Sequence, residues 1–172
     1  LEALVVKPDQ LVNWYFWAED TGPDGRPRRT LGDMYFAEVK PFEEIFREGQ
    51  SPAGGQQQQQ QQQNKSPNKQ TQELVKLQKQ IINATWNQMR SARPDPAALA
   101  TVLQSQEEAL SKAKVLLDKS SDEKTHEHVK AVAEHMTTAV KRLGAAKEEG
   151  KGLAPALAAE QAAYQALLKL QA

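Results

Sequence analysis

The stretch from residue 51 to residue 70 sets the strongest limit on what this chain can fold into. It contains eight consecutive glutamines, Gln56 to Gln63, and no hydrophobic residue larger than alanine. Such a segment cannot bury enough apolar surface to offset the entropy lost when its backbone is ordered. We therefore predict a disordered linker over residues 49–68. The less favoured alternatives are a helix extension and an aggregation element, and the glutamine run is short for the latter.

The composition differs on the two sides of this linker. Eight of the ten aromatic residues precede residue 47, whereas alanine and glutamine dominate the second part. The 172 residues include 22 basic and 22 acidic side chains and no cysteine. Balanced charge argues against general nucleic-acid binding, and the lack of cysteine excludes thiol chemistry and disulfides. No apolar run is long enough to span a bilayer, so we expect no direct membrane insertion.

Residues 1–48 are predicted to form part of a β module with a short closing helix at 41–48. Apolar residues alternate over 11–18, which puts Trp14 and Phe16 on one face of a strand and Tyr15 and Trp17 on the other. A turn-rich loop at 21–27 and a second strand at 33–39 complete a hairpin, after a short strand at 1–6. Since two or three strands are marginal alone, they either end a larger β domain or pack on the helices that follow.

Residues 69–172 are predicted to form an antiparallel bundle of three to four helices. The predicted helices run over 69–91, from Pro96 to about residue 119 and from the Ser120 cap to about residue 149, and a last segment begins at Pro155. Asp95 is the expected N-cap of the second helix, and Ser120 with Glu123 forms an expected capping box for the third. The fold class is α+β and mainly α, with a short N-terminal hairpin.

Each predicted helix carries an apolar stripe at helical spacing. We expect these stripes to pack on one another, on other helices of the parent chain or on a protein partner. The residues assigned to this role are Leu74, Leu77, Ile81, Trp86, Leu103, Leu110, Leu117, Val132, Met136 and Leu143. Trp14 and Trp17 are candidate contacts to a ligand or partner, although a core role for the aromatic strand is favoured.

The sequence offers no set of residues that predicts catalysis or cofactor binding. His128 and His135 lie seven residues apart, but the residue four positions after each is apolar, which is unsuited to a helical zinc site. Adjacent carboxylates such as Glu107 and Glu108 point about 100° apart on a helix and make no acid–base pair. The sequence also lacks a phosphate-binding loop and a nucleophile motif. We therefore predict no catalytic, cofactor or metal site, and no enzyme.

Two stretches resemble known bacterial sequences. Residues 8–20 resemble the penultimate strand of immunoglobulin-like modules in envelope proteins, with Val12, Tyr15, Ala18 and Asp20 in the usual order. Residues 35–43 and 77–87, with the glutamine-rich spacer between them, are similar to a family of large, uncharacterised membrane-anchored proteins. Those proteins combine transmembrane segments, an immunoglobulin-like module and a long helical region rich in glutamine and alanine.

The resemblance implies that this chain is a fragment anchored through its flanks on the periplasmic side of the bacterial inner membrane. It implies no catalytic residue. The predicted function is therefore that of a non-enzymatic structural or interaction segment, with the bundle mediating assembly or partner binding. The alternative is a sensing module in which the aromatic strand contacts a small molecule or glycan.

Overall fold

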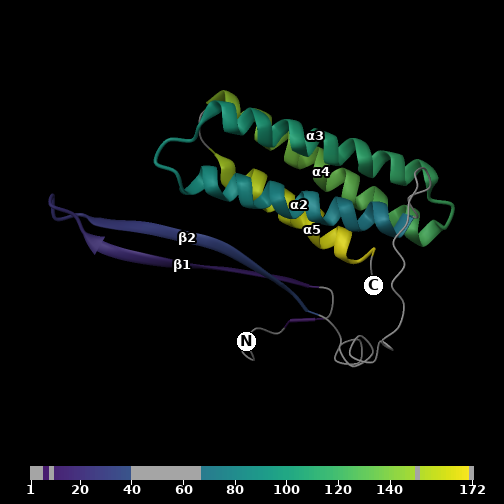
Figure 1. The fold of residues 1–172 in the computed structure, drawn as a ribbon, viewed down its shortest axis with the longest axis horizontal. Coiled ribbons are helices and arrows are strands. Elements are labelled where there is room, and N and C mark those ends of the chain that lie inside the picture. The colour runs from purple at the N-terminus through teal and green to yellow at the C-terminus, as the bar shows by residue number, and fades with distance from the viewer. Residues whose placement is uncertain (1–5, 8–9, 40–66, 150–151, 171–172) are drawn as a thin grey trace, which may run out of the picture.

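The computed structural model describes residues 6–7, 10–39, 67–149 and 152–170 (Figure 1). A two-stranded hairpin is followed by four helices, which confirms the predicted mainly helical α+β fold. The elements are β1 (Leu11–Thr21), β2 (Pro27–Glu38), α2 (Pro67–Arg90), α3 (Pro96–Lys119), α4 (Glu123–Glu149) and α5 (Leu153–Leu168). The predicted strand at 1–6, except Val6, and the predicted helix at 41–48 lie outside the described residues. So does the predicted linker, except for 67–68, which belong to α2.

The four helices form a closed ring in which each packs on two neighbours. Helix α2 contacts α3 and α5, and α4 contacts the same two helices from the other side (Figure 1). The core between them combines branched side chains with fully buried alanines such as Ala109, Ala113 and Ala139. Small residues at these positions let the helix backbones approach closely. The bundle is therefore self-contained.

Helix ends follow the predicted caps in one case and depart from them in another. Asp95 caps α3, accepting a hydrogen bond from the Ala97 backbone N–H at 3.0 Å. Ser120, predicted to cap α4, instead ends α3, and its hydroxyl donates to the Leu117 carbonyl at 2.7 Å. Asp122 takes the capping role, because its carboxylate accepts from the Thr125 N–H at 2.9 Å and suits the positive end of the helix. Hydrogen bonds from Thr125 lower the pKa of Asp122.

Helix α5 also begins earlier than predicted. It starts at Leu153 rather than Pro155, directly after Gly152, whose φ is +85°. A glycine adopts this left-handed conformation without steric cost, so the chain turns there and the helix follows immediately.

The strands are longer than predicted. Arg28 and Arg29, which precede the predicted second strand, belong to β2 and pair across the hairpin with Asp20 at 2.6 Å and Glu19 at 3.0 Å. These cross-strand ion pairs extend the ladder to a tight turn at 22–26. A β-bulge interrupts the ladder opposite Phe16, where β2 has one extra residue.

The hairpin packs on the helices, so the second of the two predicted arrangements is the one observed. Met34 and the half-buried Leu11, Leu31 and Phe36 contact an apolar surface of α2 and α5, formed by Ile82, Trp86, Leu157, Tyr164 and Leu168. Trp86, predicted to lie in the bundle core, is buried at this second core instead. The tip of the hairpin reaches past the end of the helices (Figure 1). Among the described residues, one face of β1 packs on the bundle, and the other face, although apolar, is exposed.

Candidate interaction surface

Helix α2 holds the hairpin at its bulge. The indole N–H of Trp86 donates to the Gly32 carbonyl at 3.0 Å, and the Tyr15 ring packs on the Trp86 ring with centroids 4.6 Å apart. One turn later, the Arg90 guanidinium contacts the Asp33 carboxylate at 2.8 Å. These contacts fix both strands relative to the bundle at one point.

Helix α5 supplies a second attachment towards the open end of the hairpin. Met34 is buried, and the Gln161 side-chain N–H donates to its sulfur at 3.6 Å. The Phe36 and Tyr164 rings lie 6.3 Å apart. Burial, and then the charge of Glu38, raises the pKa of Tyr164. Two separate attachments prevent the hairpin from pivoting on the bundle.

The opposite face of the hairpin is aromatic and exposed. Trp14, Phe16 and Tyr35, here called the aromatic patch, have exposed fractions of 42%, 71% and 48%. The Trp14 and Tyr35 rings are stacked at 5.9 Å and 19°, and Phe16 meets Tyr35 edge-on at 6.3 Å. Aromatic side chains grouped in this way on a surface mark interaction sites more often than scattered apolar residues do.

The two tryptophans singled out from the sequence differ in their surroundings. Trp14 belongs to the aromatic patch. Trp17 lies on the other face of β1, as the alternation predicts, and the Arg29 guanidinium sits 4.2 Å from its ring centre. Trp17 therefore contacts a cation of the hairpin, whereas Trp14 belongs to a group of three exposed rings, which makes Trp14 the better candidate contact.

The outer edge of β1 is also open. The Val39 N–H donates to the Gln10 carbonyl at 3.0 Å and the Gly22 N–H to the Arg26 carbonyl at 2.8 Å. In an antiparallel ladder, these bonds direct the odd-numbered backbone groups of β1 away from β2. No third strand pairs with the hairpin in the described part of the chain. The edge of β1 contains no proline, glycine or lysine that would discourage pairing.

A buried polar layer crosses the bundle. Gln78 and Gln106 exchange two side-chain hydrogen bonds at 3.0 and 3.1 Å, and the Thr85 hydroxyl donates to Glu160 at 2.7 Å. All four residues are fully buried. The second carboxyl oxygen of Glu160 has no hydrogen-bond partner among the described residues. Burial raises the pKa of Glu160 to about 8, although the Thr85 bond opposes the shift.

Sequence analysis identified only part of this layer. Gln106 stands three residues after Leu103 and four before Leu110 of the predicted stripe, whereas the predicted packing set includes none of the other three. Gln78 and Thr85 stand at the same helical spacing as Leu74 and Ile81, which is the signal that places them inside. Glu160 has the same signal, because it stands three residues after Leu157 and four before Tyr164 on its helix.

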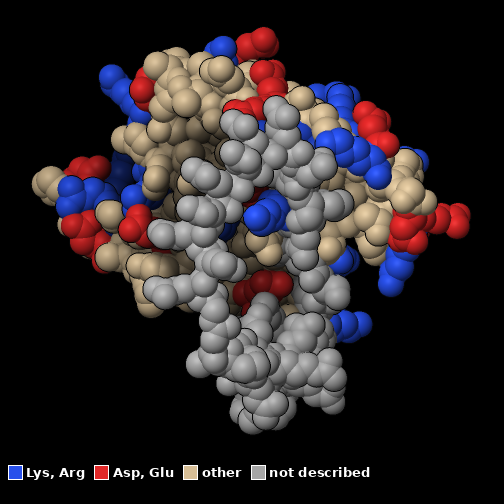
Figure 2. All heavy atoms as spheres, turned by 45° about the vertical axis from the view of Figure 1, so that its right-hand side comes forward, with Lys and Arg blue, Asp and Glu red and all other residues tan. Residues whose placement is uncertain are grey.

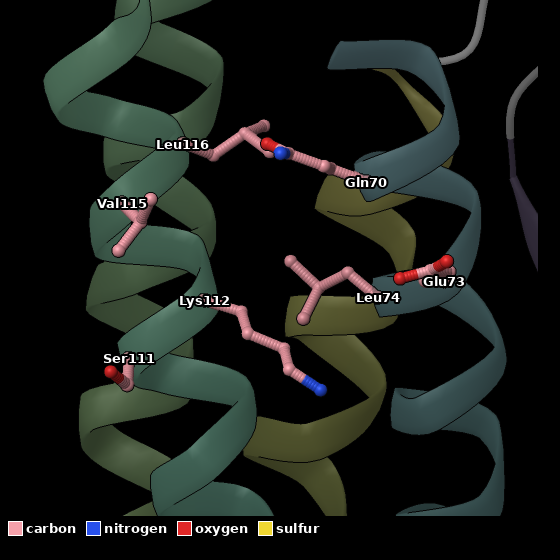
Figure 3. Close-up of a pocket in the computed structure, with 7 residues that line it drawn as sticks. All are labelled: Gln70, Glu73, Leu74, Ser111, Lys112, Val115 and Leu116. Carbon is pink, nitrogen blue, oxygen red and sulfur yellow. The ribbon is translucent and has the colours of Figure 1, made fainter. Parts of the chain in front are cut away.

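The predicted packing stripes are used within the chain. Of the ten residues assigned to them, Leu74, Ile81, Trp86, Val132, Met136 and Leu143 are buried, and Leu77, Leu103, Leu110 and Leu117 are half-buried. On α3, Leu116 is buried, whereas the neighbouring Leu117, which was assigned to the stripe, is only half-buried. A groove of about 250 Å³ remains between α2 and α3, with Leu74, Val115 and Leu116 as its apolar lining (Figure 3).

The charged side chains on the described surface of the bundle are mixed in sign (Figure 2). Lysine, arginine, aspartate and glutamate are interspersed over the face of the bundle shown in Figure 2. No three histidine or acidic side chains in the described ranges are grouped to hold a metal ion. None of the described helices has the length and hydropathy needed to cross a membrane.

Comparison of the chain with protein-family models, curated proteins and solved structures gives no match. Its function must therefore be argued from its own residues.

Proposed function

We propose that this chain is a non-enzymatic interaction segment in which the four-helix bundle is a scaffold and the hairpin contacts a protein partner. The observation that carries this proposal is the aromatic patch of Trp14, Phe16 and Tyr35, exposed on a hairpin that is attached to the bundle at two points. A fixed hairpin loses little conformational freedom on binding, which favours affinity.

The buried stripes support this assignment of roles. Leu74, Ile81, Val132 and Met136 are covered by neighbouring helices of the same chain, so the bundle does not need an outside helix to complete its core. The unsatisfied apolar surface lies on the hairpin instead. Tryptophan and tyrosine are the residues that most often dominate the energy of protein interfaces.

The proposal extends to the parent protein. The resemblance of residues 8–90 to membrane-anchored envelope proteins supports a larger bacterial envelope protein as the parent, with this segment on the periplasmic side of the membrane. This part of the proposal rests on sequence resemblance alone.

The full chain provides the test. Sedimentation velocity over a range of concentrations should show self-association that the triple variant W14S/F16S/Y35S removes and that V115S, at an exposed valine of α3, leaves intact. A photocrosslinking residue at Phe16 should capture a defined partner in cells that contain the parent protein, whereas the same residue at Val115 should not. Monomers at every concentration, together with equal crosslinking from both sites, would overturn the proposal.

A second candidate function is binding of a small molecule or glycan. The near-parallel rings of Trp14 and Tyr35 favour it, since a sugar ring stacks on such a platform. Tryptophan emission should then shift when soluble glycans are added. The W14F variant should lose the response and W17F should keep it, and an unchanged emission in the parent chain would exclude this candidate.

A further inference from the structure

The side of the bundle formed by α4 and α5 contains a hollow that the hairpin does not use. It has a volume of about 220 Å³, and three alanines, Ala131, Ala162 and Ala166, leave the space. His128 and His135 of α4 line it together with Gln165 and Lys169 from the end of α5. We infer that this hollow binds a phosphate-type anion.

The chemistry of the lining supports this ligand class. Two imidazoles, a carboxamide and an ammonium group all offer N–H donors. None of these four side chains forms a hydrogen bond or ion pair with another residue in the described ranges. Donors that lack internal partners are available to an oxyanion, and bonds from charged donors to phosphate oxygens are the strongest of this kind.

The other hollows of the bundle differ in charge. The α2–α3 groove includes Glu73 beside Lys112, and a hollow between α3 and α4 includes Glu134 beside two lysines. A carboxylate in the lining competes with an incoming anion. The α4–α5 hollow is the one of these three whose lining contains no carboxylate. The N–H donors there therefore have no acidic side chain in the lining that competes for them.

Helical spacing extends the same positive face along α4. Lys124 stands four residues before His128, and Arg142 stands seven residues after His135. Both therefore lie on the face of α4 that includes Ala131. Glu127 and Glu134 flank Ala131 on the side of α4 away from the two histidines, and Glu134 lines the neighbouring α3–α4 hollow. Neither carboxylate is among the residues that line the α4–α5 hollow.

The hollow and the hairpin use different faces of α5. The hairpin packs on Leu157, Tyr164 and Leu168, whereas the hollow is lined by Ala162, Ala166 and Lys169. The anion site is thus independent of the proposed hairpin interface, and neither proposal depends on the other.

The experiment titrates inorganic phosphate into the full chain at constant ionic strength and follows the histidine ring signals by NMR. The His128 and His135 signals should shift and saturate, while those of His126, whose ring lies 3.0 Å from the Ser120 hydroxyl, should not. The variant K169Q should weaken binding by about tenfold, the change expected when one charge-assisted hydrogen bond is lost, and H135Q, which removes the imidazole, should weaken it as well. The control variant H126Q should bind as the parent chain does.

A second arm separates the sources of the phosphate group. Vesicles of phosphatidylglycerol that bind the chain, with weaker binding by K169Q, would identify a lipid headgroup, and vesicles of phosphatidylcholine are the control. Phosphate binding without vesicle binding would identify a small soluble anion. The inference is overturned if phosphate shifts no histidine signal, or if K169Q and H135Q bind phosphate as tightly as H126Q.

Discussion

The indole N–H of Trp86 donates a hydrogen bond to the carbonyl of Gly32 at 3.0 Å, across 54 positions of the chain. Gly32 lies in the β-bulge, where a side chain would come within 3.1 Å of the Phe16 carbonyl. Because Gly32 has no side chain, the two strands can approach closely at the bulge, and the Gly32 carbonyl accepts the bond from Trp86 at the same position. The bulge is therefore also the place where the hairpin is attached to α2.

The Trp86 bond gives a first prediction. Replacing Trp86 with phenylalanine keeps most of the apolar contact with Tyr15 but removes the donor, so the free energy of unfolding should fall by about 1 kcal/mol. Urea unfolding followed by circular dichroism measures this change. Amide hydrogen exchange in β1 and β2 should accelerate. The matched control W17F should alter neither quantity by a comparable amount, and unchanged exchange in W86F would contradict the assigned role of the bond.

The buried carboxyl of Glu160 predicts how stability depends on pH. Its pKa is raised from 4.5 to about 8 by burial, so the folded state holds a proton that the unfolded state releases. The contribution is fully present below the unfolded value of 4.5 and is lost as the pH rises to about 8. The slope in this window should approach about 1.4 kcal/mol per pH unit. Urea unfolding across the window measures it.

The variant E160Q isolates the Glu160 contribution. The carboxamide of glutamine fills nearly the same volume as the carboxyl group but does not ionise. The stability of E160Q should therefore change far less over this pH window than that of the parent chain. The exposed Glu134 provides the control, and E134Q should retain the slope of the parent chain. Equal slopes in all three proteins would show that Glu160 does not hold its proton.

The Gln78–Gln106 pair predicts a non-additive cycle. Q78L leaves the Gln106 amide buried without its partner and should cost about 1–3 kcal/mol, as should Q106L. The double variant removes both polar groups, so it should be more stable than the sum of the single changes predicts. Chemical unfolding of the four proteins gives the coupling free energy, and an additive cycle would mean that the amides are not paired in solution.

Two glycines predict stability changes of opposite sign. Gly25 in the hairpin turn has φ +74°, so G25A should destabilise the protein by roughly 1 kcal/mol. Gly144 lies in α4, and a side chain there would meet no atom within 4 Å. G144A should therefore raise stability by about 0.5–1 kcal/mol through helix propensity. Thermal unfolding of both variants checks the signs.

The period of apolar residues predicted the fold class because it reports directly on burial. The faces of β1, the N-cap at Asp95 and the end of α3 at Lys119 all followed from local patterns. Local patterns failed where two signals competed. Ser120 and Asp122 both suit an N-cap, and only the structure shows that Ser120 closes the preceding helix while Asp122 opens the next.

The candidate surfaces depend on contacts distant in sequence, which no local pattern records. Trp86 has the spacing of a bundle-core residue, yet its indole N–H meets Gly32. His128 and His135 were recognised as neighbours on one helix face. Their hollow became visible only when Lys169, from the far end of α5, was brought beside them.

The contact between Met34 and Gln161 joins residues 127 positions apart, so the hairpin rests on the helix that leaves the ribosome last among the described elements. During synthesis, the surface on which β1 and β2 pack is complete only after α5 has been made. Contacts this distant in sequence slow folding relative to an ordinary up-and-down bundle. Until α5 is made, α2 alone covers part of the inner face of this aromatic hairpin, which makes the nascent chain a natural client for chaperones.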